Sequence, residues 1–136
     1  MQALHSNNNA RFRLVYHLVL VTKFRKLVLT RAMIDRADAI LRSLAVAWEG
    51  ETLECSGEPD HVHALVDLPP KVRPSDFVNN AKTVTSRRLR SEFPPLVAAY
   101  RGRPVLWSPS YCLVSAGGAP IEALKRYVQE QKKPEH

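Results

Sequence analysis

Two histidines flank one apolar residue in the segment His61-Val62-His63. Alternate side chains of a β-strand lie on the same face of its sheet. In a strand over residues 61–68, the even-numbered side chains are all apolar and would face a core, whereas His61, His63 and Asp67 would lie on the opposite, open face. Two imidazoles on one open face can bind a single metal ion, or they can be surface histidines with no common role.

A second candidate group lies near the end of the chain, where Tyr127 and Gln131 are four residues apart. In a helix this spacing puts both side chains on the same face, one turn apart. The apolar residues Ile121, Leu124 and Val128 form the neighbouring stripe, so Tyr127 is expected at the edge of the buried face. Such a tyrosine can serve only for packing, or its hydroxyl can be available for chemistry.

Hydrophobic periodicity and turn residues predict the elements that would position these groups. Thr30 is a predicted N-cap, and the dipeptide Gly117-Gly118 is a predicted break before the last helix. The order predicts an α+β fold, a ferredoxin-like or RRM-like antiparallel sheet with helices on one face, followed by a C-terminal helix that carries Tyr127. The predicted strands cover residues 13–22, 52–56, 61–68, 105–107 and 111–115, and the predicted helices cover residues 31–48, 75–93 and 120–132. Residues 96–104 are predicted to be a loop with room for a helical turn.

The length of 136 residues is typical of one domain, residues 1–136, with a polar N-terminus, residues 1–10, that is expected to be disordered. No segment has the pattern of a signal peptide or the roughly 20 apolar residues of a membrane span. Cys55 and Cys112 fit no zinc or redox spacing. These features predict a cytoplasmic protein without disulfides.

The net charge of +7 is unevenly distributed along the chain. Residues 11–31 carry six basic and no acidic residues, a charge of +6, and residues 69–103 carry eight basic and two acidic ones, again +6. The rest of the chain therefore sums to −5. Two basic blocks indicate a surface for a polyanion such as nucleic acid, although they can also be solvated faces without a partner.

Taken together, these motifs resemble the small transposases of the insertion-sequence 200/605 family, which are HUH single-tyrosine nucleases. The resemblance runs from about Tyr16 to Gln131, nearly the whole chain, and the HVH segment with a C-terminal YxxxQ helix is its most specific part. Leu20 is one departure, because many relatives are expected to have tryptophan there. The matching segments are residues 16–19 (YHLV), 22–25 (TKFR), 59–63 (PDHVH), 106–111 (LWSPSY) and 126–131 (RYVQEQ).

The resemblance implies that Tyr127 is the nucleophile and that His61, His63 and Gln131 bind a metal ion. It implies Mg²⁺ or Mn²⁺, and mixed imidazole and amide ligands would accept Mn²⁺ well. The phenol suits a reversible reaction because it leaves more readily than an alkoxide. The implied activity is cleavage and rejoining of single-stranded DNA at hairpin-bearing ends of a mobile element, through a 5′-phosphotyrosine.

The resemblance also implies a homodimer, in which Tyr127 can complete the site of its own chain or that of the partner. The Gly117-Gly118 break would allow either arrangement. When bound to DNA, the protein would associate with the nucleoid of a prokaryote. The hairpin sequence, the cleavage site and the general base stay open. The candidate phosphate contacts are Lys23, Arg25, Lys82, Arg87, Arg88 and Arg126.

A structural role is favoured for His17 in the first predicted strand, although it can also lie near the site. Trp107 is expected in the core, although Trp107 and Tyr111 can also stack on unpaired bases. In an alternative, the protein has the same fold but no catalytic activity, and it is a domesticated DNA-hairpin-binding protein. A third is an RNA-binding module, which would need exposed aromatic residues on the central strands. The predicted open face carries His61, His63 and Asp67 instead, which favours the enzyme.

Overall fold

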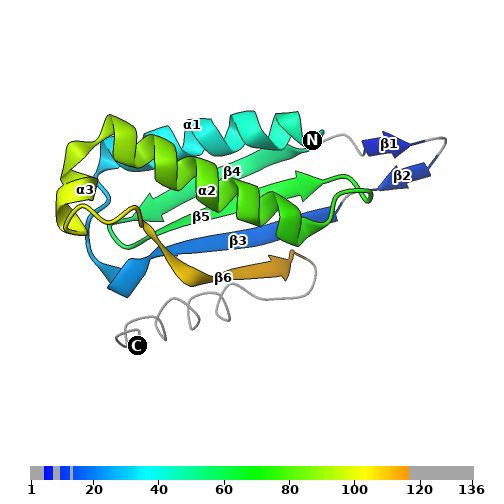
Figure 1. The fold of residues 1–136 in the computed structure, drawn as a ribbon. Helices are drawn as coiled ribbons and strands as arrows, with labels where there is room; N and C mark the ends of the chain where they lie inside the picture. Colours follow the sequence, from blue (N-terminus) through cyan, green and yellow to red (C-terminus); the bar gives the residue numbers. More distant parts are fainter. Residues whose placement is uncertain (1–4, 8–9, 13, 117–136) are drawn as a thin grey trace.

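The computed structural model describes residues 5–7, 10–12 and 14–116 (Figure 1). Within them a four-stranded antiparallel sheet has the order β4-β5-β3-β6, and a separate two-stranded hairpin joins β1 to β2. The elements are β1 (His5–Asn7), β2 (Ala10–Phe12), β3 (Leu14–Thr22), η1 (Lys23–Arg25), α1 (Arg31–Ala47), β4 (Glu51–Glu58), β5 (His61–Leu68), α2 (Pro74–Glu92), α3 (Pro94–Ala99) and β6 (Trp107–Ser115).

Helices α1 and α2 lie side by side on one face of the sheet (Figure 1). The main core lies between these helices and the sheet, and it includes the even-numbered side chains of β5, as predicted. On the other face, Val19 and Val21 of β3 are buried with Cys112 and Val114 of β6 packed against them. The α+β sandwich predicted from the sequence is confirmed.

Helix α1 begins where the sequence predicts, because the Thr30 hydroxyl accepts a hydrogen bond from the Met33 backbone N–H (3.3 Å). The helix packs closely on the β4–β5 hairpin at Gly57. A Cβ there would lie 2.9 Å from the His61 carbonyl oxygen and 3.1 Å from the side chain of Ile34. The absence of a side chain at Gly57 therefore lets α1 approach the end of the hairpin that carries His61.

One predicted pair of elements differs from the structure. The two short strands predicted around Ser108-Pro109 are one strand, β6, whose pairing with β3 shifts register between Leu20 and Thr22. Because β6 is an edge strand and bulged at this point, it accommodates a proline that has no N–H to donate. The segment over residues 96–104, predicted as a loop with room for a helical turn, begins with the last four residues of α3. Of residues 1–10, the structure describes β1 and the first residue of β2.

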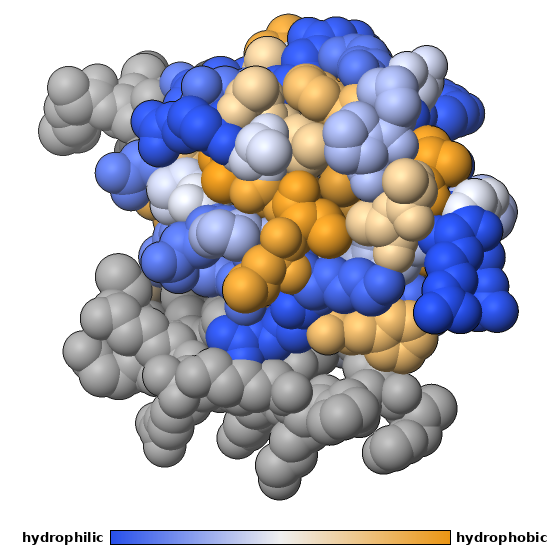
Figure 2. Space-filling view, turned by 90° about the vertical axis from the view of Figure 1, so that its left-hand side faces the viewer, coloured by the Kyte–Doolittle hydropathy of each residue, from blue (hydrophilic) through white to orange (hydrophobic). Residues whose placement is uncertain are grey.

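One prediction about the sheet surface is wrong. Asp67, expected on the open face, is fully buried, and its neighbours in the sheet are Val15 of β3 and Glu51 of β4. Figure 2 shows the end of the molecule formed by η1, α3 and the β4–β5 turn, where apolar residues gather at the centre of a hydrophilic surface. Phe24 and Leu27, in and just after η1, are exposed large apolar residues. Among the described residues, no helix has the length and apolar character of a membrane span.

Candidate functional site

His61 and His63 lie on the face of the sheet opposite α1 and α2, as the alternation along β5 predicts. Their pairing partners on β3 are Val21 and Val19, both buried on that same face. Both histidines are half-buried rather than freely exposed. The strand thus holds two partly exposed imidazoles beside an apolar surface.

His63 contacts a third imidazole, that of His17 on β3. The Nε2 atom of His63 lies 2.9 Å from Nδ1 of His17, and the two rings stack with centroids 5.2 Å apart and planes 13° from parallel. Burial lowers the pKa of His63, and the neighbouring His17 and His61 lower it further. A lowered pKa favours the neutral ring, which has a lone pair to offer to a hydrogen-bond donor or to a metal ion.

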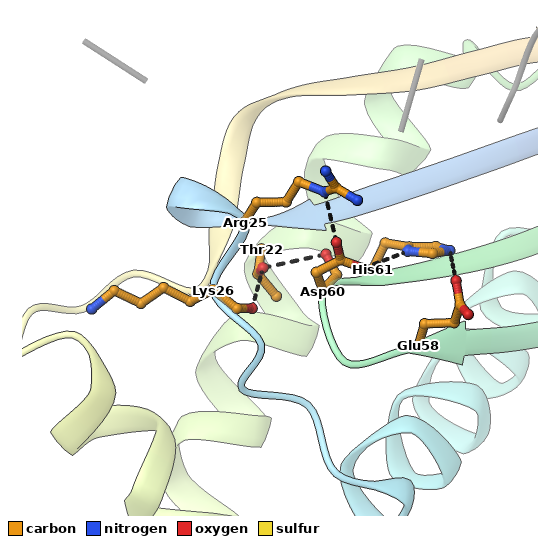
Figure 3. Close-up of polar contacts among 6 residues, drawn as sticks. All are labelled: Thr22, Arg25, Lys26, Glu58, Asp60 and His61. Carbon is orange, nitrogen blue, oxygen red and sulfur yellow. Dashed lines mark hydrogen bonds and ion pairs between the residues drawn. The ribbon is translucent and has the colours of Figure 1, made fainter. Parts of the chain in front are cut away.

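His61 has acidic neighbours on both of its nitrogens (Figure 3). Nδ1 lies 2.8 Å from a carboxylate oxygen of Asp60, whose side chain is 8% exposed, and Nε2 lies 3.6 Å from the carboxylate of Glu58, which is 72% exposed. The other oxygen of Asp60 lies 2.6 Å from Nε of Arg25. His61 is therefore held from the Nδ1 side by a buried carboxylate, whereas its Nε2 side meets an exposed one.

The imidazoles of His61 and His63 can supply part of a metal site. Two imidazoles on one strand, one of them kept neutral, are suitable ligands for a divalent transition metal. Among the His, Cys, Asp and Glu side chains that the structure describes, no group of three is arranged to hold an ion. His61 and His63 thus need a further donor. The predicted third ligand Gln131 and the predicted nucleophile Tyr127 lie outside the described residues. To bind an ion through Nε2, His63 would also have to exchange its contact with His17.

The residues predicted to contact phosphate have different surroundings. Lys82 donates hydrogen bonds to the carbonyls of Ser108 (2.9 Å) and Pro109 (3.0 Å), and thus ties α2 to the start of β6. Arg25 forms the ion pair with Asp60, and the ammonium of Lys23 lies 5.3 Å from the centre of the Phe24 ring. Arg87 is exposed on α2, Arg88 lies 3.9 Å from Glu92, and Arg126 lies outside the described residues.

Sequence reasoning missed two groups in this site. No role of its own is predicted for Asp60, which lies in the matching segment 59–63, and a structural role is favoured for His17. The position of Asp60 directly before His61 is a signal that could have been used, because adjacent carboxylate and imidazole groups often bond. The contact of His17 with His63 depends on the β3–β5 register, in which His17 is paired with Leu65, and the sequence does not show this register.

The chain matches the protein family described as "Transposase IS200 like" over residues 10–131. It is a member of that family. Family membership implies an enzyme that cleaves DNA. The chain is 32% identical over 120 residues to the ISDra2 transposase TnpA of Deinococcus radiodurans, an alignment that covers 88% of this chain and 85% of the relative. It is 28% identical over 123 residues to the transposase for insertion sequence element IS200 of Salmonella typhimurium, covering 90% and 80% of the two chains.

Solved structures show the same fold. A crystal structure of a candidate transposase from Deinococcus radiodurans superposes with a TM-score of 0.84 at 31% identity, covering 94% of this chain and 98% of that one. A REP-associated tyrosine transposase bound to a REP hairpin superposes with a TM-score of 0.54 at 12% identity, covering 90% and 68%. At 12% identity the second match concerns the fold alone. The predicted family and fold class are thus confirmed.

Proposed function

We propose that this IS200-like transposase cleaves and rejoins single-stranded DNA, with Tyr127 as the nucleophile and a metal ion held by His61, His63 and Gln131. The observation that carries this proposal is the placement of His61 and His63 on one face of β5, where burial and neighbouring imidazoles lower the pKa of His63. A neutral His63 is the form that binds a cation. The chain keeps both histidines and the terminal Tyr127 and Gln131, which a binding protein without catalysis would not need.

The proposed reaction exchanges one phosphodiester for another. The Tyr127 oxygen attacks the scissile phosphorus and loses its proton, the bond from phosphorus to the 3′-oxygen breaks, and that oxygen leaves as a hydroxyl once it is protonated. The 5′ end is then linked to Tyr127. In the second half, the 3′-hydroxyl of another strand attacks the same phosphorus and releases the phenol, so no external energy source is required.

The ion, Mg²⁺ or Mn²⁺, would polarise the scissile phosphate and orient it for in-line attack. The chain's own contribution is to fix two ligands on a rigid central strand. Because imidazole favours transition metals and Mg²⁺ prefers oxygen, we expect the site to bind Mn²⁺ more tightly than Mg²⁺.

The proposed substrate is single-stranded DNA with hairpins near the ends of a mobile element. Its support is the two basic blocks, over residues 11–31 and 69–103, together with the fold shared with a protein that was solved bound to a REP hairpin. We further propose a homodimer in the cytoplasm, associated with the nucleoid through DNA, in which Tyr127 completes the histidine site of its own chain or that of the partner.

The variant His61→Ala separates catalysis from DNA binding. We expect cleavage of a single-stranded hairpin substrate with Mn²⁺ to fall on the order of 100-fold or more, because one metal ligand is lost. Hairpin affinity, measured by fluorescence anisotropy with EDTA, should stay within about threefold, since an imidazole contributes little to phosphate contact.

The variant His136→Ala removes a histidine at the end of the chain and is the control. Equal losses of cleavage and binding in His61→Ala would assign His61 to DNA contact. Tight hairpin binding by the wild-type protein without any cleavage would instead favour the domesticated DNA-binding protein.

A further inference from the structure

A chain of three charged or ionisable side chains leads from η1 to the candidate metal ligand His61 (Figure 3). Arg25 contacts one carboxylate oxygen of Asp60, and the other oxygen contacts Nδ1 of His61, at 2.6 and 2.8 Å. The side chains of Arg25 and His61 are each 14% exposed and that of Asp60 is 8% exposed. At this burial the electrostatic interactions are less screened by water than on an open surface.

The backbone around Asp60 holds its carboxylate in place. The Asp60 carbonyl accepts a hydrogen bond from the backbone N–H (2.9 Å) of Thr22, a fully buried residue at the end of β3 whose hydroxyl oxygen also lies 3.2 Å from that carbonyl. The neighbouring Pro59 carbonyl accepts a hydrogen bond from the Leu29 N–H (2.9 Å). The β4–β5 turn is thus tied to the segment on both sides of η1.

Arg25 reaches Asp60 through an unusual backbone conformation. Phe24 and Arg25 have φ values of 60° and 54°, two consecutive non-glycine residues in the left-handed region. Such a conformation costs free energy and persists where surrounding contacts impose it. Here the Thr22 hydroxyl closes the turn by donating to the Lys26 carbonyl (2.7 Å). Nε of Arg25 is buried and its N–H is not aligned on an acceptor, so the contact with Asp60 is a close ion pair.

The chemistry of the carboxylate determines which nitrogen of His61 is free. An ionised carboxylate only accepts hydrogen bonds, so Nδ1 of His61 must carry the hydrogen. In the neutral ring Nε2 then holds the lone pair, and it lies on the side of the exposed Glu58. Carboxylates that fix a metal-binding histidine in this way raise its basicity and set the orientation of its ring.

We propose that Arg25 and Asp60 are positioning residues for the metal site: Arg25 holds the Asp60 carboxylate, which fixes His61 as the Nδ1–H tautomer and presents its Nε2 to the ion. That His61 binds the ion rests on the proposed function. The tautomer of His61, by contrast, is a property of the metal-free protein. It gives Arg25 a role toward Asp60 instead of the predicted contact with DNA phosphate.

The variant Asp60→Asn tests the proposal because an asparagine side chain has one acceptor oxygen where aspartate has two. If that oxygen stays with Arg25, the amide N–H₂ faces Nδ1 of His61, which must then accept, and the hydrogen moves to Nε2. Long-range ¹H–¹⁵N correlation spectra of the metal-free, histidine-labelled protein should show the Nδ1–H form of His61 in the wild type and its loss in Asp60→Asn. Mn²⁺ affinity, measured by electron paramagnetic resonance, should fall about 10- to 100-fold.

The matched control is Asp38→Asn, which removes an ion pair of the same type and length, between Asp38 and Nε of Arg42 (2.6 Å) on α1. It should leave both the His61 tautomer and Mn²⁺ affinity unchanged. Arg25→Gln keeps the carboxylate but not its anchor, so it should show a mixture of His61 tautomers, and it serves as the test if Asp60→Asn does not fold.

The two proposals fail in different ways. An unchanged tautomer and unchanged Mn²⁺ affinity in both Asp60→Asn and Arg25→Gln would overturn the positioning role. A wild-type protein that binds no Mn²⁺ would remove the metal ion from the proposed function, whereas the spectrum of the metal-free protein would still decide whether Asp60 fixes His61.

Discussion

The ionisation of His63 is set by its neighbours on the open face of the sheet. Its ring is half-buried, stacks on His17 and lies two residues from His61. A charge on His63 would therefore lose hydration and would face two other imidazoles that can also become charged, which is why its pKa is lowered from 6.5. The same features keep the ring neutral near pH 7, the state required of a ligand.

This lowered pKa predicts how stability depends on pH. Above about pH 6.5 His63 is neutral in both the folded and unfolded states, so its contribution to stability is fully present. As the pH falls below 6.5, the unfolded state takes up the proton first, and the free energy of unfolding decreases until the pH passes the folded pKa. Urea denaturation at about pH 7.5 and pH 5 should show a smaller decrease for His63→Gln than for the wild type.

All other titrating groups are common to the two proteins, so the difference between them isolates His63. Equal decreases in both would mean that His63 has an ordinary pKa in the folded protein. A larger decrease in the variant would mean that the folded state stabilises a charged His63.

At the scale of elements, the junction of α2 and β6 depends on two polar side chains of α2. Thr85 is fully buried, and its hydroxyl donates to the Ala81 carbonyl (2.6 Å) and accepts from Nε1 of Trp107 (2.8 Å). Lys82, one turn earlier, donates to the two carbonyls at the bulge of β6. These contacts fix the edge strand that pairs with β3 beside the candidate site.

Replacing Thr85 by valine is expected to weaken this junction without changing its shape. The Trp107 N–H would remain buried without an acceptor, which should lower the free energy of unfolding by about 1–3 kcal/mol. Thr83→Val is the matched control, since Thr83 also donates to the carbonyl four residues earlier (3.0 Å) but is exposed. Chemical denaturation should give a change within about 0.5 kcal/mol for this control. Equal effects of the two variants would mean that the hydrogen bond from Trp107 to Thr85 does not stabilise the junction.

Most of the elements could be predicted because they have strong local signals. The threonine cap and apolar spacing of α1, the alternation along β5 and the prolines around α2 all act within a few residues. The single strand β6 could not be predicted, because Pro109 is a strand breaker unless the strand lies at an edge and bulges, and sheet order is a long-range property.

Less of the candidate site could be predicted, for a related reason. Alternation predicts His61 and His63 on one face, but it also predicts an exposed Asp67 there, and Asp67 is fully buried. The contacts of Arg25 with Asp60 and of His17 with His63 join residues far apart in the sequence. Spacing along one strand does not reveal such contacts.

In the molecule as a whole, the proposed site joins the central strand β5 to Tyr127 near the end of the sequence. The open face of the sheet presents His61 and His63, and the two basic blocks give the chain most of its positive charge. Membership of the IS200-like transposases implies a DNA-cleaving enzyme, and the proposed mechanism assigns the bond-breaking step to Tyr127. The central claim is thus that Tyr127 becomes covalently attached to DNA beside the two histidines.

The most direct test mixes the protein with a single-stranded oligonucleotide that carries an element end with its hairpin, in the presence of Mn²⁺, and separates the products on a denaturing gel. The account predicts a covalent protein–DNA adduct from the wild type and from Tyr111→Phe, a control at a half-buried tyrosine of β6. It predicts no adduct from Tyr127→Phe or after addition of EDTA. An adduct of equal yield from Tyr127→Phe would contradict the account, because the DNA would then be attached to another residue.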